Sequence, residues 1–92
     1  MRGIKDEFKQ PDSVFRRERD CTDRQIEFIV ASYAAAYENN SASAILAARR
    51  YRKGEHRFAT CRHMHISESQ YYKLLSKFLS IAKAVHERLA AE

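Results

Sequence analysis

The chain has 92 residues, which suffices for one small domain and leaves little material for a second core. Only two Gly and one Pro occur among abundant Ala, Leu, Lys, Arg and Glu, which predicts an all-α fold rather than a turn-rich β fold. No run of about 18 apolar residues is present for a membrane span, and no apolar segment follows the charged N-terminus as in a secretory signal. We therefore expect a cytoplasmic protein without a membrane partner.

The positive charge is concentrated in the second half of the chain. The formal net charge is +5, and residues 47–92 alone hold ten Lys and Arg against four acids. This excess favours a polyanionic partner such as nucleic acid, although a solvated helical surface gives similar counts.

The first twenty residues are polar, of mixed charge, and interrupted by Pro11. Because proline disrupts a helix interior, we predict that residues 1–20 form a polar tail or short helix and that residues 21–92 form the helical domain. Thr22 and Gln25 then have the spacing of a capping box, which predicts a helix start. This helix should end near residues 38–40, with one stripe at helical spacing: Ile26, Ile29, Val30, Tyr33 and Tyr37.

Three further helices follow in the predicted order. Ser41 or Ser43 begins a helix that runs past Tyr51, and Gly54 is placed to end it. A short helix over residues 55–63 and a turn over 64–66 come next. Ser67 and Gln70 form a second capping box, which opens a helix of about six turns from Glu68 towards the C-terminus. The prediction is a small all-α domain of four to five helices.

The last two helices have the layout of a helix-turn-helix unit: a short helix, a turn of three or four residues, and a capped second helix. We expect Cys61 to be the small residue on the inner face of the first helix, and Tyr71 and Leu74 to face back from the second. Two positions fit less well, because Thr60 lies where a larger apolar residue would pack better and His65 where Gly is often favoured.

The outward face of the second helix is the candidate surface for reading DNA bases. Gln can pair with adenine and Lys can donate to guanine in the major groove, although the same residues also occur on ordinary solvated faces. The candidate base-reading residues are Ser69, Gln70, Tyr72, Lys73 and Lys77. The candidate contacts to the phosphate backbone are Arg49, Arg50, Arg52, Lys53, Arg57 and Arg62. A cationic helix end also favours the helix dipole without any DNA.

Enzymatic and metal chemistry have little support in the sequence. Cys61, His63 and His65 are potential soft ligands, but the paired spacing of a structural zinc site is missing, and Cys21 is the only other thiol. We expect both thiols to be reduced. No acid partner or oxyanion element accompanies Cys61, and glycine-rich phosphate loops and diagnostic carboxylate pairs are absent. We expect no enzyme, no metal and no cofactor.

Two segments resemble a known family. Residues 51–54 (Y-R-K-G) and 64–73 (M-H-I-S-E-S-Q-Y-Y-K), with Ala82, resemble the C-terminal part of ArpU-like and RinA-like phage transcriptional regulators. In that family a similar motif opens the recognition helix of a domain like region 4 of sigma factors. The resemblance covers residues 47–89, about half of the chain, and implies a phage-derived DNA-binding regulator in the host cytoplasm. It places Ser69, Gln70, Tyr72 and Lys73 on the recognition helix and Tyr71 and Leu74 on its buried side.

Two functions therefore remain open. One is a sequence-specific regulator that binds double-stranded DNA. The alternative is a helical interaction module that inhibits a host factor, such as RNA polymerase, or assembles on itself. The observation that favours it is the high aromatic content, because exposed aromatic residues often anchor protein interfaces. The aromatic residues concerned are Tyr33, Tyr37, Tyr51, Tyr71, Tyr72 and Phe78. A homodimer is compatible with both functions, and we expect its contact on Phe78, Leu79, Ala82, Val85 and Leu89.

Overall fold

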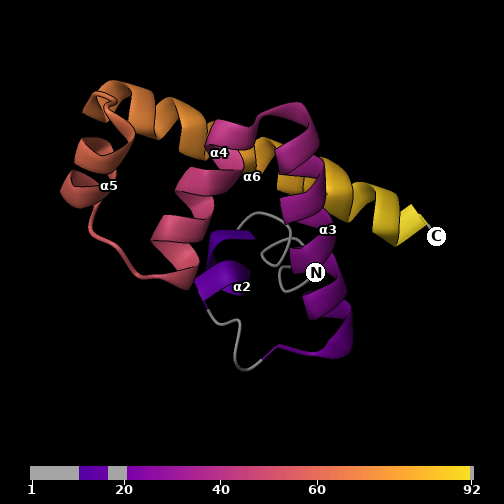
Figure 1. Cartoon of the computed structure of the whole chain (residues 1–92). Helices are drawn as coiled ribbons and strands as arrows, with labels where there is room; N and C mark the ends of the chain where they lie inside the picture. Colours follow the sequence, from indigo (N-terminus) through magenta and orange to yellow (C-terminus); the bar gives the residue numbers. More distant parts are fainter. Residues whose placement is uncertain (1–10, 17–20, 92) are drawn as a thin grey trace.

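A computed structural model describes residues 11–16 and 21–91 of the chain. These residues form helices and no strand, which confirms the predicted all-α fold. The elements are α2 (Pro11–Arg16), α3 (Asp23–Asn39), α4 (Ser41–Ala47) with its π-helical continuation η2 (Ala48–Arg52), α5 (Arg57–Met64) and α6 (Glu68–Ala91). Helices α3 and α4 cross the long α6, and α5 lies beside the start of α6 at one end of the molecule (Figure 1).

The predicted capping box at the start of α3 is confirmed. The Gln25 backbone N–H donates to Thr22 Oγ1 at 3.2 Å, and the Thr22 N–H donates to Gln25 Oε1 at 2.8 Å. At the other end, Asn40 closes α3 with its backbone N–H and begins α4 with its side chain, which accepts from the Ser43 N–H at 3.2 Å. One residue therefore makes the sharp corner between these two helices.

The helix that begins at Ser41 widens in its last turn and stops at Gly54, as the sequence predicts. In η2 the Lys53 N–H reaches back to the Ala48 carbonyl at 3.1 Å, and the Glu55 N–H reaches the Arg49 carbonyl at 2.9 Å. Gly54 has a φ of 66°, a left-handed conformation that glycine adopts without steric cost. The chain then turns back towards α5.

Small buried residues let the three main helices approach closely. Ser32 and Ala36 on α3, Ala44 and Ala47 on α4, and Ala82 on α6 are all fully buried. Short side chains at helix crossings bring the helix axes together and leave the larger residues to fill the space on either side.

An aromatic cluster centred on Phe15 fills the rest of the core. Phe15 is 1% exposed, and its ring centre lies 5.0 Å from that of Phe78, 5.4 Å from those of Phe28 and Tyr51, and 5.8 Å from that of Tyr33. Ring pairs at such separations add to the stabilisation that comes from burial. Part of the N-terminal segment thus lies inside the core.

Proline explains how α2 begins. Pro11 is the first residue of this helix, where its fixed φ is favourable and its missing N–H costs no hydrogen bond. Val14 and Phe15 follow one helical turn later and are buried. The remainder of the predicted tail, residues 1–10 and 17–20, lies outside the described residues.

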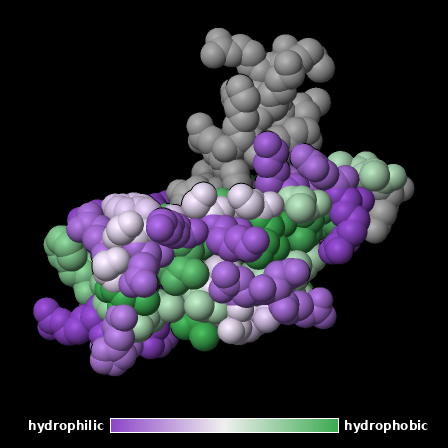
Figure 2. Space-filling view, turned by 90° about the horizontal axis from the view of Figure 1, so that it is seen from above, coloured by the Kyte–Doolittle hydropathy of each residue, from purple (hydrophilic) through white to green (hydrophobic). Residues whose placement is uncertain are grey.

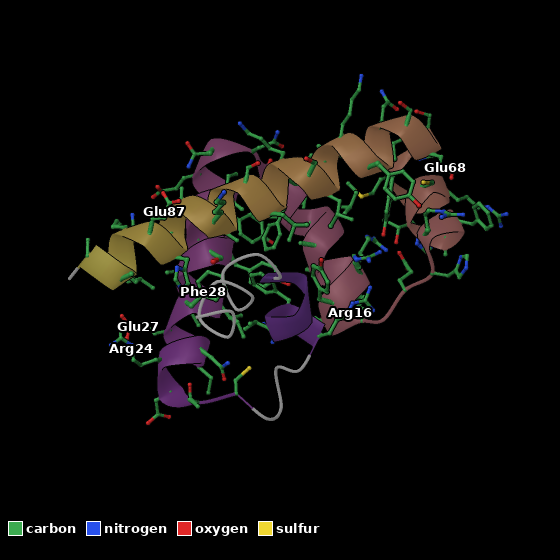
Figure 3. The ribbon with its side chains drawn as sticks, turned by 180° about the vertical axis from the view of Figure 1, so that it is seen from behind. Arg16, Arg24, Glu27, Phe28, Glu68 and Glu87 are labelled. Atoms are coloured by element: carbon green, nitrogen blue, oxygen red, sulfur yellow. The ribbon has the colours of Figure 1, made fainter. Side chains whose placement is uncertain are left out.

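The predicted stripe on α3 forms, but only its edge is buried. The core face of α3 consists of Phe28, Ile29, Ser32 and Ala36, and Figure 3 shows Phe28 directed inward while Arg24 and Glu27 point outward. Ile26, Val30 and Tyr37 are 45%, 63% and 51% exposed. The core face of α3 is therefore offset from the stripe, because small residues as well as large ones make up the buried side of this helix.

The expected dimer contact on α6 is also occupied within the chain itself. Phe78, Ala82 and Val85 are buried in the core, and Leu79 and Leu89 pack against it. This face of α6 is therefore an intramolecular one and is not available to a partner. In the described part of the chain, no helix combines the length and the apolar character needed to cross a membrane.

Candidate functional site

Helices α5 and α6 meet through a tight connection of three residues, 65–67. The N–H of His65 donates to the Arg62 carbonyl at 3.4 Å, and the N–H of Ile66 donates to the Cys61 carbonyl at 3.0 Å. His65 has a φ of 56°, the left-handed conformation that a non-glycine residue seldom adopts. The position where the sequence suggests Gly does need that backbone shape. Helix α5 itself runs one residue beyond the predicted end, so Met64 belongs to the helix rather than to the turn.

The second capping box is present at the start of α6. The Gln70 N–H donates to Ser67 Oγ at 3.1 Å, and the Ser67 N–H donates to Gln70 Oε1 at 2.8 Å. This reciprocal pair fixes where α6 begins and therefore which residues occupy its first exposed turn. The side-chain carbonyl oxygen of Gln70 is therefore already engaged within the protein.

Thr60, not Cys61, is the fully buried small residue on the inner face of α5. The prediction for Cys61 was wrong; it is half-buried, with Sγ 3.8 Å from the Ser67 carbonyl oxygen. Thr60 is tolerated in the interior because its hydroxyl donates to Glu55 Oε1 at 2.7 Å, so this buried hydroxyl is paired.

Glu55 is the centre of a polar cluster that joins η2 to α5. Besides Thr60, Arg49 Nη1 donates to Glu55 Oε2 at 3.1 Å, and His63 Nδ1 lies 3.1 Å from the same oxygen. The hydrogen bond from Thr60, followed by the hydrogen bond and positive charge of Arg49, holds the pKa of Glu55 below its ordinary value of 4.5. Sequence reasoning missed this cluster, because Glu55 precedes α5 in an irregular segment and no periodic pattern marks it.

A second set of polar contacts joins α5 to the outward face of α6. Arg57 donates from Nη1 to the Tyr72 hydroxyl, and its Nη2 lies 3.7 Å from Glu68 Oε1. The hydrogen bond to Tyr72, with a smaller effect of the Glu68 carboxylate, raises the pKa of Arg57. Arg57 and Tyr72 therefore hold the two helices together, and both side chains are partly used inside the protein.

Arg50 has a similar internal role. Its Nη1 donates to the hydroxyl of the fully buried Tyr71 at 3.0 Å, and its guanidinium carbon lies 5.4 Å from the centre of the Tyr51 ring. Of the six predicted phosphate contacts, Arg49, Arg50 and Arg57 are thus tied to other side chains. Lys53 and Arg62 are exposed, and Arg52 lines a groove described below.

The outward face of α6 is exposed as predicted. Ser69, Lys73 and Lys77 are solvent-exposed, and no side-chain hydrogen bond or ion pair engages them within residues 11–16 and 21–91. Tyr71 and Phe78 are buried on the opposite side of the helix, and Leu74 and Leu75 are half-buried. Viewed from above, the end that carries α5 and the start of α6 mixes hydrophilic and hydrophobic residues (Figure 2).

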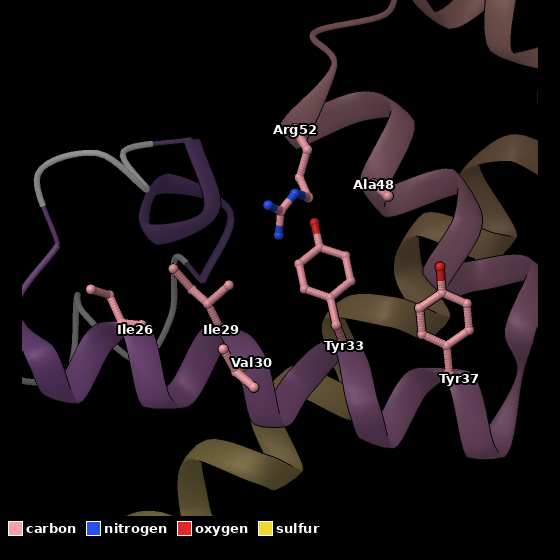
Figure 4. A pocket seen from close by; sticks show the side chains of 7 residues that line it. All are labelled: Ile26, Ile29, Val30, Tyr33, Tyr37, Ala48 and Arg52. Atoms are coloured by element: carbon pink, nitrogen blue, oxygen red, sulfur yellow. The ribbon is translucent and has the colours of Figure 1, made fainter.

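An open groove on the other side of the molecule was not predicted. It has a volume of about 370 Å³ and lies between α3 and the end of the α4–η2 helix. Tyr33 and Tyr37 rise from α3 towards the segment that carries Ala48 and Arg52 (Figure 4). The lining residues are Ile26, Ile29, Val30, Tyr33, Tyr37, Ala48 and Arg52. The apolar spacing on α3 was visible in the sequence, but its exposure was not.

Among the described residues, no three His, Cys, Asp or Glu side chains lie together as a metal-ligand set. Comparison of the chain with protein-family models, curated proteins and solved structures found no match.

Proposed function

We propose that this chain is a sequence-specific regulator that binds double-stranded DNA through α5, the turn and α6. The observation that carries the proposal is the exposed face of the first half of α6, where Ser69, Lys73 and Lys77 make no side-chain hydrogen bond or ion pair with the described residues and follow a fixed helix start. The major groove of B-DNA admits an α-helix, and the N-terminal residues of a recognition helix reach the base edges.

The contacts inside the protein divide the predicted base-reading residues into two groups. Ser69, Lys73 and Lys77 are the base-reading or groove-lining candidates, since their polar atoms are available. Gln70 and Tyr72 instead set the start of α6 and its angle to α5 through their bonds to Ser67 and Arg57. Lys53 and Arg62, both exposed, are the phosphate-contact candidates.

The experiment is binding to duplexes selected in vitro from a random pool, measured by fluorescence anisotropy. We expect Lys73→Ala to weaken binding to the selected site by about 1–3 kcal/mol, the usual value of one base contact. Lys83→Ala is the matched control, because it removes the same charge from the exposed face of α6 further along the helix. It should produce only the smaller, sequence-independent loss of one phosphate interaction.

Two results would count against the proposal. Equal losses for Lys73→Ala and Lys83→Ala would mean that Lys73 reads no base. If the unmutated protein retards no DNA at about 50 mM salt, DNA binding itself is wrong, because phosphate contacts alone should be visible there.

The alternative function is an interaction module for a host protein such as RNA polymerase. The aromatic residues that favoured it are mostly not on the surface. Tyr33, Tyr51 and Phe78 belong to the aromatic cluster around Phe15, and Tyr71 is fully buried. Of the six aromatics that suggested a protein interface, only Tyr37 and Tyr72 are largely exposed. Exposed aromatic side chains are therefore confined to two positions of this set, and one of them, Tyr37, lines the groove on α3.

A further inference from the structure

We infer that the groove on α3 is a self-association surface, in which a second copy of this chain packs its α3 alongside in a parallel two-fold dimer. The inference does not rest on DNA binding. It begins from the exposed stripe of Ile26, Val30 and Tyr37, three of the six large apolar residues that are exposed in the described part of the chain. Their gathering on one helix makes a continuous apolar face rather than a single exposed side chain.

The spacing of the stripe identifies the occupant as a helix. Ile26, Val30, Tyr33 and Tyr37 are separated by four, three and four residues, which is the seam spacing of two helices packed at a small angle. The groove beside the seam is partly open to solvent, and it is lined by side chains from α3 and η2. It therefore suits the side chains of a neighbouring helix better than a small molecule.

The charges on the two edges of the stripe argue for a second copy. On the outer edge Asp23 and Glu27 outnumber Arg24, and Figure 3 shows Glu27 directed away from the body of the molecule. On the inner edge Arg52 forms the cationic wall of the groove. A guanidinium has five N–H donors, so Arg52 can face a carboxylate in addition to its contacts within the chain.

Symmetry then selects the parallel arrangement. A two-fold axis along the helices turns the outer edge of one α3 towards the inner edge of the other, so Glu27 approaches Arg52 of the second copy on both sides. An antiparallel pair would instead bring outer edge to outer edge, with Asp23 and Glu27 near the partner's Glu38. Like charges at such a contact are unfavourable, whereas the parallel pair places opposite charges against each other on both edges of the same patch.

The test is the molar mass of the protein without DNA, measured by light scattering and sedimentation over a concentration series. We expect a dimer, and we expect Val30→Glu to raise its dissociation constant at least about tenfold, because a charge would enter an apolar contact. The helix content should not change, since Val30 is 63% exposed. Phe58→Glu is the control, as Phe58 is 58% exposed on α5, away from the groove, and should leave the dimer intact.

A charge exchange tests the orientation. Glu27→Arg and Arg52→Glu should each weaken the dimer, and the double variant should restore it. Single changes that strengthen association, or a double variant that fails to recover, would overturn the parallel arrangement. A chain that stays monomeric at every concentration would overturn the inference. The stripe would then be a contact surface for the N-terminal segment or for a different protein. Lys73→Ala should still dimerise, so failure of DNA binding and failure of self-association are distinguishable.

Discussion

Single side chains decide how α5 is held against the end of η2, and one of these contacts is the hydrogen bond from Thr60 to Glu55. Because the folded-state pKa of Glu55 is lowered, its contribution to stability is present above 4.5, the unfolded value, and is lost as the pH falls through the folded value. Thr60→Val removes the largest cause of this lowering. We expect the variant to be less stable than the unmutated protein at pH 7.

The expected difference between the two proteins is itself pH-dependent. Urea unfolding at about pH 7 and about pH 3 should show a larger gap in the free energy of unfolding at the higher pH, where Glu55 is ionised in both states. If the difference in the free energy of unfolding were the same at both pH values, Thr60 would not stabilise the protein through its hydrogen bond to the Glu55 carboxylate.

At this scale the sequence was a poor guide to which polar residues are engaged. Exposure of Ser69, Lys73 and Lys77 followed from helical periodicity, which depends only on neighbouring residues. The engagement of Tyr72 by Arg57 did not follow, because it joins residues fifteen positions apart on different helices. Choosing Cys61 over Thr60 failed for the same reason, since the partner that makes a buried hydroxyl acceptable lies outside the helix.

The starts of α3 and α6 were the most predictable features, because a capping box involves only residues within a span of four positions. Ser67 and Ser69 provide a matched pair on one turn, since Ser67 caps α6 and Ser69 is exposed without a side-chain partner in the described residues. Ser67→Ala should lower stability by about 1 kcal/mol. Ser69→Ala should change it by less than about 0.5 kcal/mol.

The same pair separates folding from recognition when thermal unfolding and binding to the selected DNA are both measured. We expect Ser69→Ala to weaken DNA binding with little effect on the melting temperature, and Ser67→Ala to lower the melting temperature. Equal destabilisation by both substitutions would contradict the assignment of the cap to Ser67.

The turn between α5 and α6 depends on one strained residue. His65 has a positive φ, which costs an L-residue with a side chain about 1–2 kcal/mol and a β-branched residue more. His65→Val should therefore destabilise the protein by at least about 1 kcal/mol, whereas His65→Gly should be neutral or stabilising. Urea unfolding of the two variants measures this, and a Gly variant less stable than the Val variant would show that the turn is not left-handed.

For the whole molecule, element order was foreseeable, but the way the elements share the core was not. The periodicity of α3 showed a stripe of large apolar residues, yet the fully buried positions of α3 and α4 include Ser32, Ala36 and Ala44, which hydrophobicity alone does not mark. The space left beside the close helix crossings is filled by aromatic rings, and one of them comes from α2. A polar segment with a central proline gave no local sign that Phe15 would be at the centre of that cluster.

This packing makes α2 a structural part of the domain rather than an appendage. Truncating a buried Phe to Ala usually costs about 3–5 kcal/mol, a large share of the 5–15 kcal/mol that stabilises a typical domain. Phe15→Ala should therefore leave the chain close to unfolding at 25 °C, as measured by urea denaturation followed by helix circular dichroism. Phe58→Ala is the matched control, because Phe58 is 58% exposed and its loss should cost less than about 0.5 kcal/mol. If the two variants proved equally stable, α2 would not be packed in solution, and the folded domain would begin at residue 21.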